Sequence, residues 1–236
     1  MAKPVLLNNI DHRQLRIDVR SRGAALGDDV MFALTFPGEF RSVQAHYPIV
    51  FQKTSNGVLQ PVALFGFRQG QNLFLDGTRW DAHYLPLAIE RQPFLIGRAD
   101  DEFVVHVDLD SPRVGGSGGE LAFREHGGSS EFLDRMTLVL SSLHDGLQTT
   151  PAFVASLLQY ELLEAFVFDI ELDDGTKNRL AGFYTINEDR LHRLDGKALE
   201  HLQRGGHLEP IFMAVASLSH FRDLIERMNR LDAARR

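Results

Sequence analysis

The sequence contains no cysteine among its 236 residues, which excludes disulfide bonds, thiolate zinc sites and a cysteine nucleophile. Long hydrophobic runs are also missing. The longest, from Ile211 to Leu218, falls far below the roughly 20 residues that a membrane-spanning helix requires, so we expect no membrane insertion. The N-terminal stretch Met1 to Asn9 lacks the continuous apolar segment of a secretory signal, which favours a cytoplasmic location.

An excess of positive charge is absent too. The formal net charge is −7 at pH 7, and such a chain repels phosphate backbones, so nucleic acid is not an expected partner. Hydrophobic residues make up 44% of the chain and charged residues 24%, a balance that allows a sizeable core. We expect one domain over residues 1–236, with a subdivision, if any, near the glycine-rich loop at residues 111–119.

The first half of the chain reads as antiparallel β-structure, because short apolar runs are separated by Gly, Pro and Asn. Two runs, Ile49 to Thr54 and Val58 to Phe67, flank an Asn-Gly pair and predict a hairpin. Pro61 would then lie on an edge strand or at a bulge. Further strands are expected at Gln92 to Gly97 and at Phe103 to Leu109.

The second half shows helical spacing. Apolar residues from Phe132 to Leu147 recur every three or four positions after Ser129 and Ser130, which predicts an amphipathic helix. Thr150-Pro151 reads as the start of a second helix. Short helices are expected from Asn187 and from Asp195, and a last one from Phe221 to Leu231.

Two further segments of this half read as β-structure. A hairpin is expected around Asp173-Asp174-Gly175, with alternating residues before and after it. The apolar run Leu208 to Ala216 reads as a buried strand. Strands and helices do not alternate regularly, so the sequence indicates an α+β fold rather than a doubly wound parallel sheet.

Catalytic motifs are scarce. The spacings G-x-G-x-x-G and G-x-x-x-x-G-K-[ST] are missing, and Gly116-Ser117-Gly118 lies in a predicted loop without the strand-to-helix context that a G-x-S-x-G nucleophile elbow needs. Whether the chain is an enzyme therefore stays open, and no cofactor is expected. The one metal-like pattern is His106-Val107-Asp108, because residues two apart on a strand share a face and His-x-Asp supplies two ligands of a facial iron(II) site. His192, His201 or His207 would supply the third ligand. The alternative is a hydrogen-bonded or solvent-facing pair without metal.

A compact set of aromatic and cationic residues suggests a binding surface. It comprises Arg79, Trp80, His83, Tyr84 and Arg91. The alternative is that Trp80, the only tryptophan, anchors the core with the arginines at its rim. His46 and Tyr47 are further candidates for this surface, although the His-Tyr-Pro sequence also suits the entry to a strand.

Several landmarks, taken in order, resemble one bacterial family. They are Glu39-Phe40, His46-Tyr47-Pro48-Ile49-Val50-Phe51, Pro61 to Phe67, Asn72-Leu73-Phe74, Arg79-Trp80-Asp81-Ala82-His83-Tyr84-Leu85-Pro86, Arg91-Gln92-Pro93-Phe94, Gly119 to Phe123, Leu180 to Phe183, Gly206-His207-Leu208 and Ala216-Ser217-Leu218. Their order and spacing are similar to the SapC family over about Val30 to Leu231. One departure is His106, which stands where the family suggests an apolar or small residue.

The resemblance implies an accessory or binding protein associated with a bacterial cell-envelope system, such as a surface layer or peptide and nutrient uptake. Its partner would be a peptide or a protein, and the family implies no agreed catalytic residues. Two alternatives stay open. One is an Fe(II) oxygenase-like enzyme using the pair His106 and Asp108 with a later histidine, for example His207. The other is a self-assembling structural protein.

Overall fold

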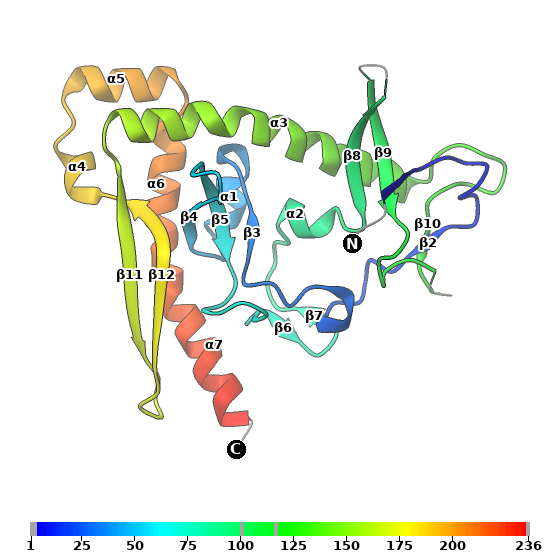
Figure 1. The fold of residues 1–236 in the computed structure, drawn as a ribbon, viewed down its shortest axis with the longest axis horizontal. Coiled ribbons are helices and arrows are strands. Elements are labelled where there is room, and N and C mark those ends of the chain that lie inside the picture. The colour runs from blue at the N-terminus through cyan, green and yellow to red at the C-terminus, as the bar shows by residue number, and fades with distance from the viewer. Residues whose placement is uncertain (1–3, 100–101, 116–117, 235–236) are drawn as a thin grey trace. The chain divides into compact units, whose positions relative to one another are not determined.

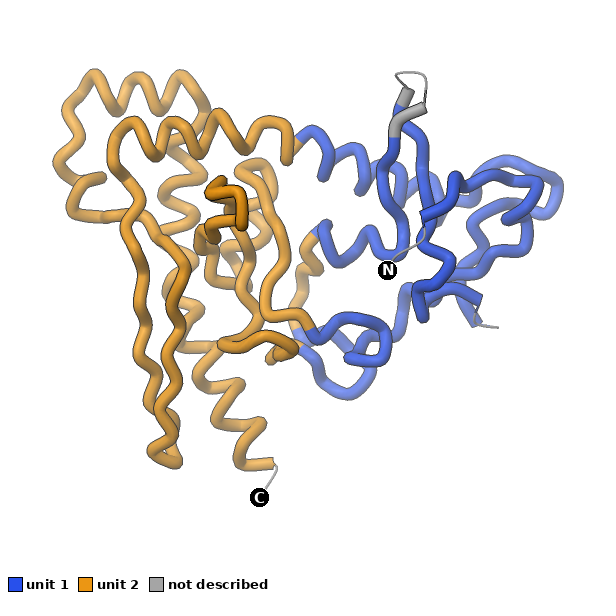
Figure 2. Tube along the Cα trace, in the orientation of Figure 1, with its two compact units in different colours: residues 1–29, 75–81, 87–145 blue, residues 30–74, 82–86, 146–236 orange. Residues whose placement is uncertain are grey.

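The computed structural model describes residues 4–99, 102–115 and 118–234. It is mixed α+β with 38% helix and 25% strand, and its sheets are antiparallel, which confirms the predicted fold class. The chain forms two compact units (Figure 2). Unit 1 comprises residues 1–29, 75–81 and 87–145, and unit 2 comprises residues 30–74, 82–86 and 146–236.

The central element of unit 2 is a five-stranded antiparallel sheet in the order β11-β12-β4-β5-β3 (Figure 1). Its strands are β3 (Phe32–Leu34), β4 (Ile49–Lys53), β5 (Leu59–Leu64), β11 (Leu163–Glu171) and β12 (Lys177–Ile186). Both predicted hairpins are confirmed, and their turns use Gly57 and Gly175 at φ 81° each, a conformation that favours glycine.

Pro61 lies inside this sheet, so its placement on an edge or at a bulge was wrong. β5 pairs with β4 on one side and with β3 on the other. The carbonyl of Pro61 accepts the N–H of Thr35 at 3.2 Å, and this contact comes just after β3 ends at Leu34. Proline has no N–H and cannot donate a hydrogen bond to a neighbouring strand. The sheet tolerates Pro61 because it lies where the hydrogen-bond ladder to β3 ends.

Helices complete unit 2. They are η2 (Pro37–Glu39), α1 (Phe40–Val43), α4 (Glu188–His192), α5 (Gly196–Arg204), α6 (Leu208–Ser217), η3 (Leu218–His220) and α7 (Phe221–Ala234). Asn187 and Asp195 cap α4 and α5 as predicted, each accepting a backbone N–H at 2.8 Å. The predicted strand at Leu208 to Ala216 is wrong, because that run forms α6, with Pro210 tolerated in the first turn.

The long helix α3 (Glu131–Gln159) replaces the two helices expected on either side of Pro151. Its start is confirmed, since the Ser130 hydroxyl accepts the N–H of Leu133 at 3.1 Å. Pro151 lies inside the helix and is exposed, so its ring meets solvent rather than packed side chains. Gly146 lets the helix approach Phe36 in unit 2, because a methyl group there would lie 2.1 Å from the phenylalanine ring.

Unit 1 is built from short strands around its own core. The three-stranded sheet runs β1 (Pro4–Leu6), β9 (Glu102–Asp108) and β8 (Phe94–Ala99), and the last two confirm the predicted strands. The remaining elements are β2 (Arg16–Ile17), η1 (Ala24–Leu26), β6 (Leu75–Asp76), β7 (Arg79–Trp80), α2 (Leu87–Glu90) and β10 (Glu120–Leu121). Buried residues from β2, β8, β9 and the first half of α3 form its hydrophobic core, including Ile17, Phe94, Val107, Phe132 and Met136.

The glycine-rich loop at residues 111–119 belongs to unit 1, apart from residues 116–117, which lie outside the described part of the chain. The boundaries between the units therefore fall elsewhere than at this loop. The expectation of one cooperative domain stays a prediction. Over the described ranges, no helix has the length and apolar character needed to span a membrane.

Candidate functional site

Residues 39–47 and the 82–86 segment, which are far apart in the sequence, meet in unit 2. The Tyr84 hydroxyl donates to the Glu39 carboxylate at 2.9 Å, and the Tyr47 hydroxyl donates to the Tyr84 backbone carbonyl. The His46 and His83 rings lie beside each other with centroids 6.0 Å apart. We call these five residues, Glu39, His46, Tyr47, His83 and Tyr84, the Glu39–Tyr84 cluster.

Glu39 is the buried polar centre of the cluster, with 4% of its surface exposed. The 3₁₀ turn η2 begins at Pro37, and it carries Glu39 back toward Thr35. The Thr35 hydroxyl donates to one carboxylate oxygen at 2.7 Å, and the Tyr84 hydroxyl donates to the other at 2.9 Å. Each carboxylate oxygen therefore has a hydrogen-bond donor, and pairing buried polar atoms in this way lowers the cost of burying Glu39.

Tyr47 supports the cluster from within the core. It is fully buried, and its ring packs against Phe65 at 5.2 Å and Phe74 at 4.7 Å between centroids. Edge-to-face contacts of this kind hold a ring in one orientation. The hydroxyl of Tyr47 is thereby aimed at the Tyr84 carbonyl, which fixes the backbone of the 82–86 segment.

A third histidine, His220 of η3, stands close enough to affect His46. Its Nε2 lies 3.0 Å from the Gln44 carbonyl and its Nδ1 lies 2.5 Å from the Asp223 carboxylate. Partial burial lowers the pKa of His46, and repulsion from His83 and His220 lowers it further. His46 is therefore neutral at pH 7 and can accept a hydrogen bond.

The predicted aromatic and cationic surface divides between the units. Arg79 and Trp80 form β7 in unit 1, whereas His83 and Tyr84 belong to unit 2. Arg79 is exposed and pairs with Asp76 at 3.0 Å, and Trp80 is half-buried rather than a core anchor.

Arg91 has a structural partner in unit 1. Its Nη1 donates to the Phe94 carbonyl at 2.7 Å, and burial lowers the pKa of its guanidinium. This bond joins the end of α2 to the start of β8. The candidate binding residues that the structure brings together in unit 2 are thus His46, Tyr47 and Tyr84, and their role in binding stays a prediction.

The proposed iron ligands do not form a group. His106 and Asp108 lie on β9 in unit 1, and His207 precedes α6 in unit 2. The His106 ring packs over Gly97, where a methyl group would lie 2.3 Å from it, and Asp108 accepts the N–H of Asp110 at 3.2 Å. In the described ranges, no three His, Asp or Glu side chains gather as a metal ion requires. The iron site therefore has no support in this geometry.

His207 has an environment of its own. Its ring faces Phe153 with centroids 5.6 Å apart, and its Nδ1 is buried without a hydrogen-bond partner among the described atoms. Burial lowers the pKa of His207, and the nearby His201 lowers it further. A neutral, packed imidazole at the start of α6 is the result.

Unit 1 contains a buried ion pair that the sequence did not reveal. Asp28 is fully buried and Arg113 is 1% exposed, and their side chains meet at 2.6 Å. Arg113 also donates to the backbone carbonyls of Asp18 at 3.3 Å and Ser21 at 3.1 Å. The other Asp28 oxygen accepts the N–H of Gly23 at 2.9 Å. This network ties three loops of unit 1 together.

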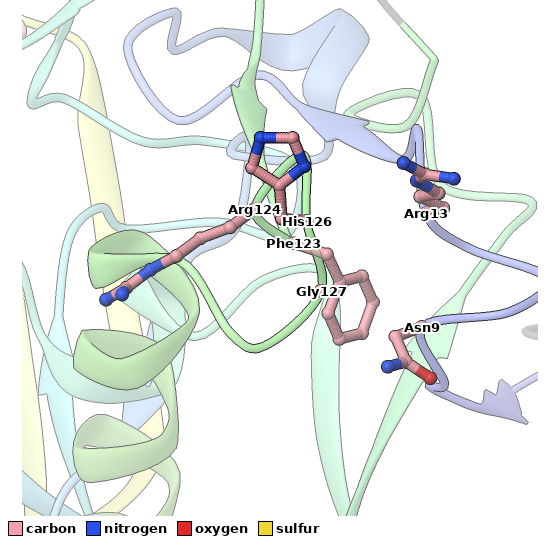
Figure 3. Close-up of a pocket in the computed structure, with 6 residues that line it drawn as sticks. All are labelled: Asn9, Arg13, Phe123, Arg124, His126 and Gly127. Atoms are coloured by element: carbon pink, nitrogen blue, oxygen red, sulfur yellow. The ribbon is translucent and has the colours of Figure 1, made fainter.

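A surface pocket of about 310 Å³ also lies in unit 1. It is lined by Asn9, Arg13, Phe123, Arg124, His126 and Gly127 (Figure 3). Figure 3 shows the Arg124 side chain extending away from Arg13, so the two guanidinium groups do not converge on one point. Arg13 instead donates to the Glu125 carbonyl at 2.5 Å. None of the residues predicted as binding or metal sites lines this pocket.

A family model described as SapC matches residues 7–224. The chain belongs to the SapC family. Neither the comparison with curated proteins nor that with solved structures gave a match.

SapC membership gives the Glu39–Tyr84 cluster a context. The residues of the cluster come from three of the landmarks that carried the resemblance. Glu39 belongs to Glu39-Phe40, His46 and Tyr47 belong to His46 to Phe51, and His83 and Tyr84 belong to Arg79 to Pro86. Glu39 was not singled out as a functional residue. Its sequence signal was the Thr-x-Pro-x-Glu pattern from Thr35, in which a proline starts a tight turn and a polar residue stands at each end.

Proposed function

We propose that this SapC-family chain is an accessory binding protein of a bacterial cell-envelope system, acting from the cytoplasmic side. Its Glu39–Tyr84 cluster would contact a peptide or protein partner. The envelope role rests on what SapC membership implies. The observation that supports the binding site is the convergence of Glu39, His46-Tyr47 and His83-Tyr84 in one hydrogen-bonded group.

The cluster has the rigidity that recognition favours. Tyr84 is held at both ends, because its hydroxyl is bound to Glu39 and its backbone carbonyl is bound to Tyr47. A tyrosine that is already ordered loses little conformational entropy when a partner covers it. Tyr84 therefore offers a partly accessible ring at low entropic cost.

The two histidines supply polar contacts beside that ring. His83 is exposed and His46 is half-buried, so both reach the surface. Neutral imidazole carries one donor and one acceptor, which matches the N–H and C=O groups of a peptide backbone. An acidic side chain on the partner would in addition favour the protonated form of His46, so binding to acidic segments should strengthen as the pH falls.

A pull-down from a cell-envelope extract tests the proposal, with the purified chain as bait and mass spectrometry as readout. We expect a reproducible set of partners that is lost in His83→Ala and weakened in Tyr84→Phe. The matched control is His126→Ala, since His126 is also an exposed histidine but lies in unit 1. Equal capture by the two alanine variants, or no specific capture by the wild type, would contradict the proposal.

A further inference from the structure

The outer strand of the unit 2 sheet has an open edge. β11 (Leu163–Glu171) stands at the end of the strand order and pairs only with β12 among the strands of the described chain (Figure 1). An edge strand of nine residues exposes a row of backbone N–H and C=O groups that can pair with another strand. Edges of this length are usually covered or interrupted in stable monomers.

The direction of these backbone groups follows from the two ends of the hairpin. At one end the N–H of Asn187 donates to the Leu162 carbonyl at 2.8 Å, and at the other the N–H of Leu172 donates to the Thr176 carbonyl at 3.0 Å. In an antiparallel ladder, the backbone groups of alternate residues point toward the same neighbouring strand, so the N–H and C=O groups of the even-numbered residues of β11 point toward β12. The backbone groups of the odd-numbered residues point toward the open edge. These residues are Leu163, Ala165, Val167, Asp169 and Glu171.

The irregularity in the hairpin leaves β11 itself regular. The register advances by two residues on β11, from Phe166 to Phe168, and by three on β12, from Phe183 to Leu180. The extra residue therefore belongs to β12, where Gly182 adopts φ 86°. The usual protection of an edge by a bulge is thus absent from the strand that forms the edge.

The three central side chains of β11 form a pattern that is symmetric about Val167. Phe166 and Phe168 stack with centroids 5.8 Å apart, and both contact Phe221 of α7, at 5.2 Å and 4.9 Å. These two rings are half-buried, and Val167 between them is 54% exposed. The sequence Phe-Val-Phe reads the same in both directions, so an antiparallel copy centred on Val167 would set an aromatic residue opposite an aromatic residue.

We propose that β11 is a homodimer interface, where a second copy of this chain pairs antiparallel through its own β11 about a two-fold axis at Val167. Phe166 of one copy then lies opposite Phe168 of the other, and Ala165 lies opposite Asp169. Each odd-numbered pair exchanges two backbone hydrogen bonds, because both residues face outward. The interface is isologous and closes after two copies.

Charge does not oppose this arrangement. In this register Glu164 lies opposite Ile170 and Glu171 lies opposite Leu163, so no acid faces an acid. Asp169 is already bound to Arg179 at 2.8 Å, and Glu171 lies 3.8 Å from Lys177 of the same hairpin. Two of the three acidic side chains of β11 are therefore paired with cations within each copy, and the third, Glu164, accepts a hydrogen bond from the Asn187 side chain at 2.7 Å. A second copy is thus acceptable as the occupant of this edge.

Analytical ultracentrifugation of the full chain tests the proposal through Val167, the position that meets itself. The wild type should sediment as a dimer at concentrations on the order of tens of micromolar. Val167→Lys and Val167→Glu should each weaken the dimer by at least about tenfold, because like charges would face each other at the axis. An equimolar mixture of the two variants should restore the dimer, since opposite charges then meet.

Val58→Lys is the matched control, because Val58 is also an exposed valine of unit 2, at 60%, but lies beside the β4–β5 turn. It should keep the wild-type dimer. A monomeric wild type, a dimer unchanged by both Val167 variants, or variants that stay monomeric when mixed would overturn the proposal. Because this inference does not use the Glu39–Tyr84 cluster, its outcome is independent of the proposed function.

Discussion

Replacing Asp28 by Asn should strongly destabilise unit 1. The substitution removes the negative charge that two largely buried arginines share, while it keeps the shape of the side chain. Asp28 lies 2.6 Å from Arg113 and 3.8 Å from Arg22. Both guanidinium groups are largely shielded from water, with side-chain exposures of 1% and 11%. The variant leaves two buried cations close together without their shared anion.

The expected loss can be bounded from these contacts. Removing one partner of a buried ion pair typically costs about 3–5 kcal/mol, because the remaining charge stays buried without compensation. Burial lowers the pKa of Arg22, and repulsion from Arg113 lowers it further, which shows that the two cations already oppose each other. We therefore expect a loss of at least about 3 kcal/mol, a large part of the stability of an ordinary domain.

Urea unfolding followed by two signals measures this effect. The fluorescence of Trp80, the only tryptophan, reports on unit 1, and far-ultraviolet circular dichroism reports on the whole chain. Asp29→Asn is the matched control, since Asp29 is the exposed neighbour of Asp28 and the chemical change is identical. The control should change the free energy of unfolding by less than about 0.5 kcal/mol. Equal effects of the two substitutions would refute the assignment of Asp28 as the essential counter-charge.

Three further predictions concern single residues. Gly146→Ala should lower the free energy of unfolding by about 1–3 kcal/mol, although this exchange usually stabilises a helix, because the new methyl group would lie 2.1 Å from Phe36; a stabilised variant would show that the helix can move away. The pKa of His46 is lower in the folded protein than in the unfolded chain, so its contribution to stability is full above pH ~6.5 and falls as the pH drops below that value. His46→Gln should reduce the dependence of the unfolding free energy on pH, measured by urea titrations at several pH values, and an unchanged dependence would contradict this assignment. His106→Ala should cost about 1 kcal/mol through lost packing over Gly97 while leaving the iron content of anaerobically prepared protein unchanged, and iron lost with the histidine would revive the metal hypothesis.

Local signals predicted most of the secondary structure. Asn56-Gly57 and Asp174-Gly175 fixed both hairpins, because glycine reaches the positive φ that such turns need. The starts of three helices followed from Ser130, Asn187 and Asp195, whose side chains accept the first free N–H groups. Signals of this kind act within a few residues, so they can be read without knowing the rest of the fold.

The errors arose where local signals were ambiguous. An apolar run of about nine residues suits a buried strand or a buried helix, and at Leu208 to Ala216 packing selected the helix. Pro210 in the first turn was the available clue. Pro151 was read as a helix start, but α3 continues through it. A proline at an exposed position can remain inside a helix whose two halves are each held by buried side chains.

The site was recovered only in part, for a related reason. His46, Tyr47 and Tyr84 were chosen for their chemistry, yet their common partner Glu39 was missed because its burial depends on contacts to Thr35 and Tyr84. Asp28 and Arg113 are 85 residues apart, and nothing in the local sequence of either signals the other. Long-range pairs of single charges leave no periodic pattern to detect.

Photocrosslinking in cells would test most directly whether the Glu39–Tyr84 cluster is a recognition surface. A photoreactive amino acid placed at His83 should form covalent adducts with a defined peptide or protein of the cell envelope, whereas the same amino acid at His126 should not. Adducts at both positions alike, or at neither, would contradict the account.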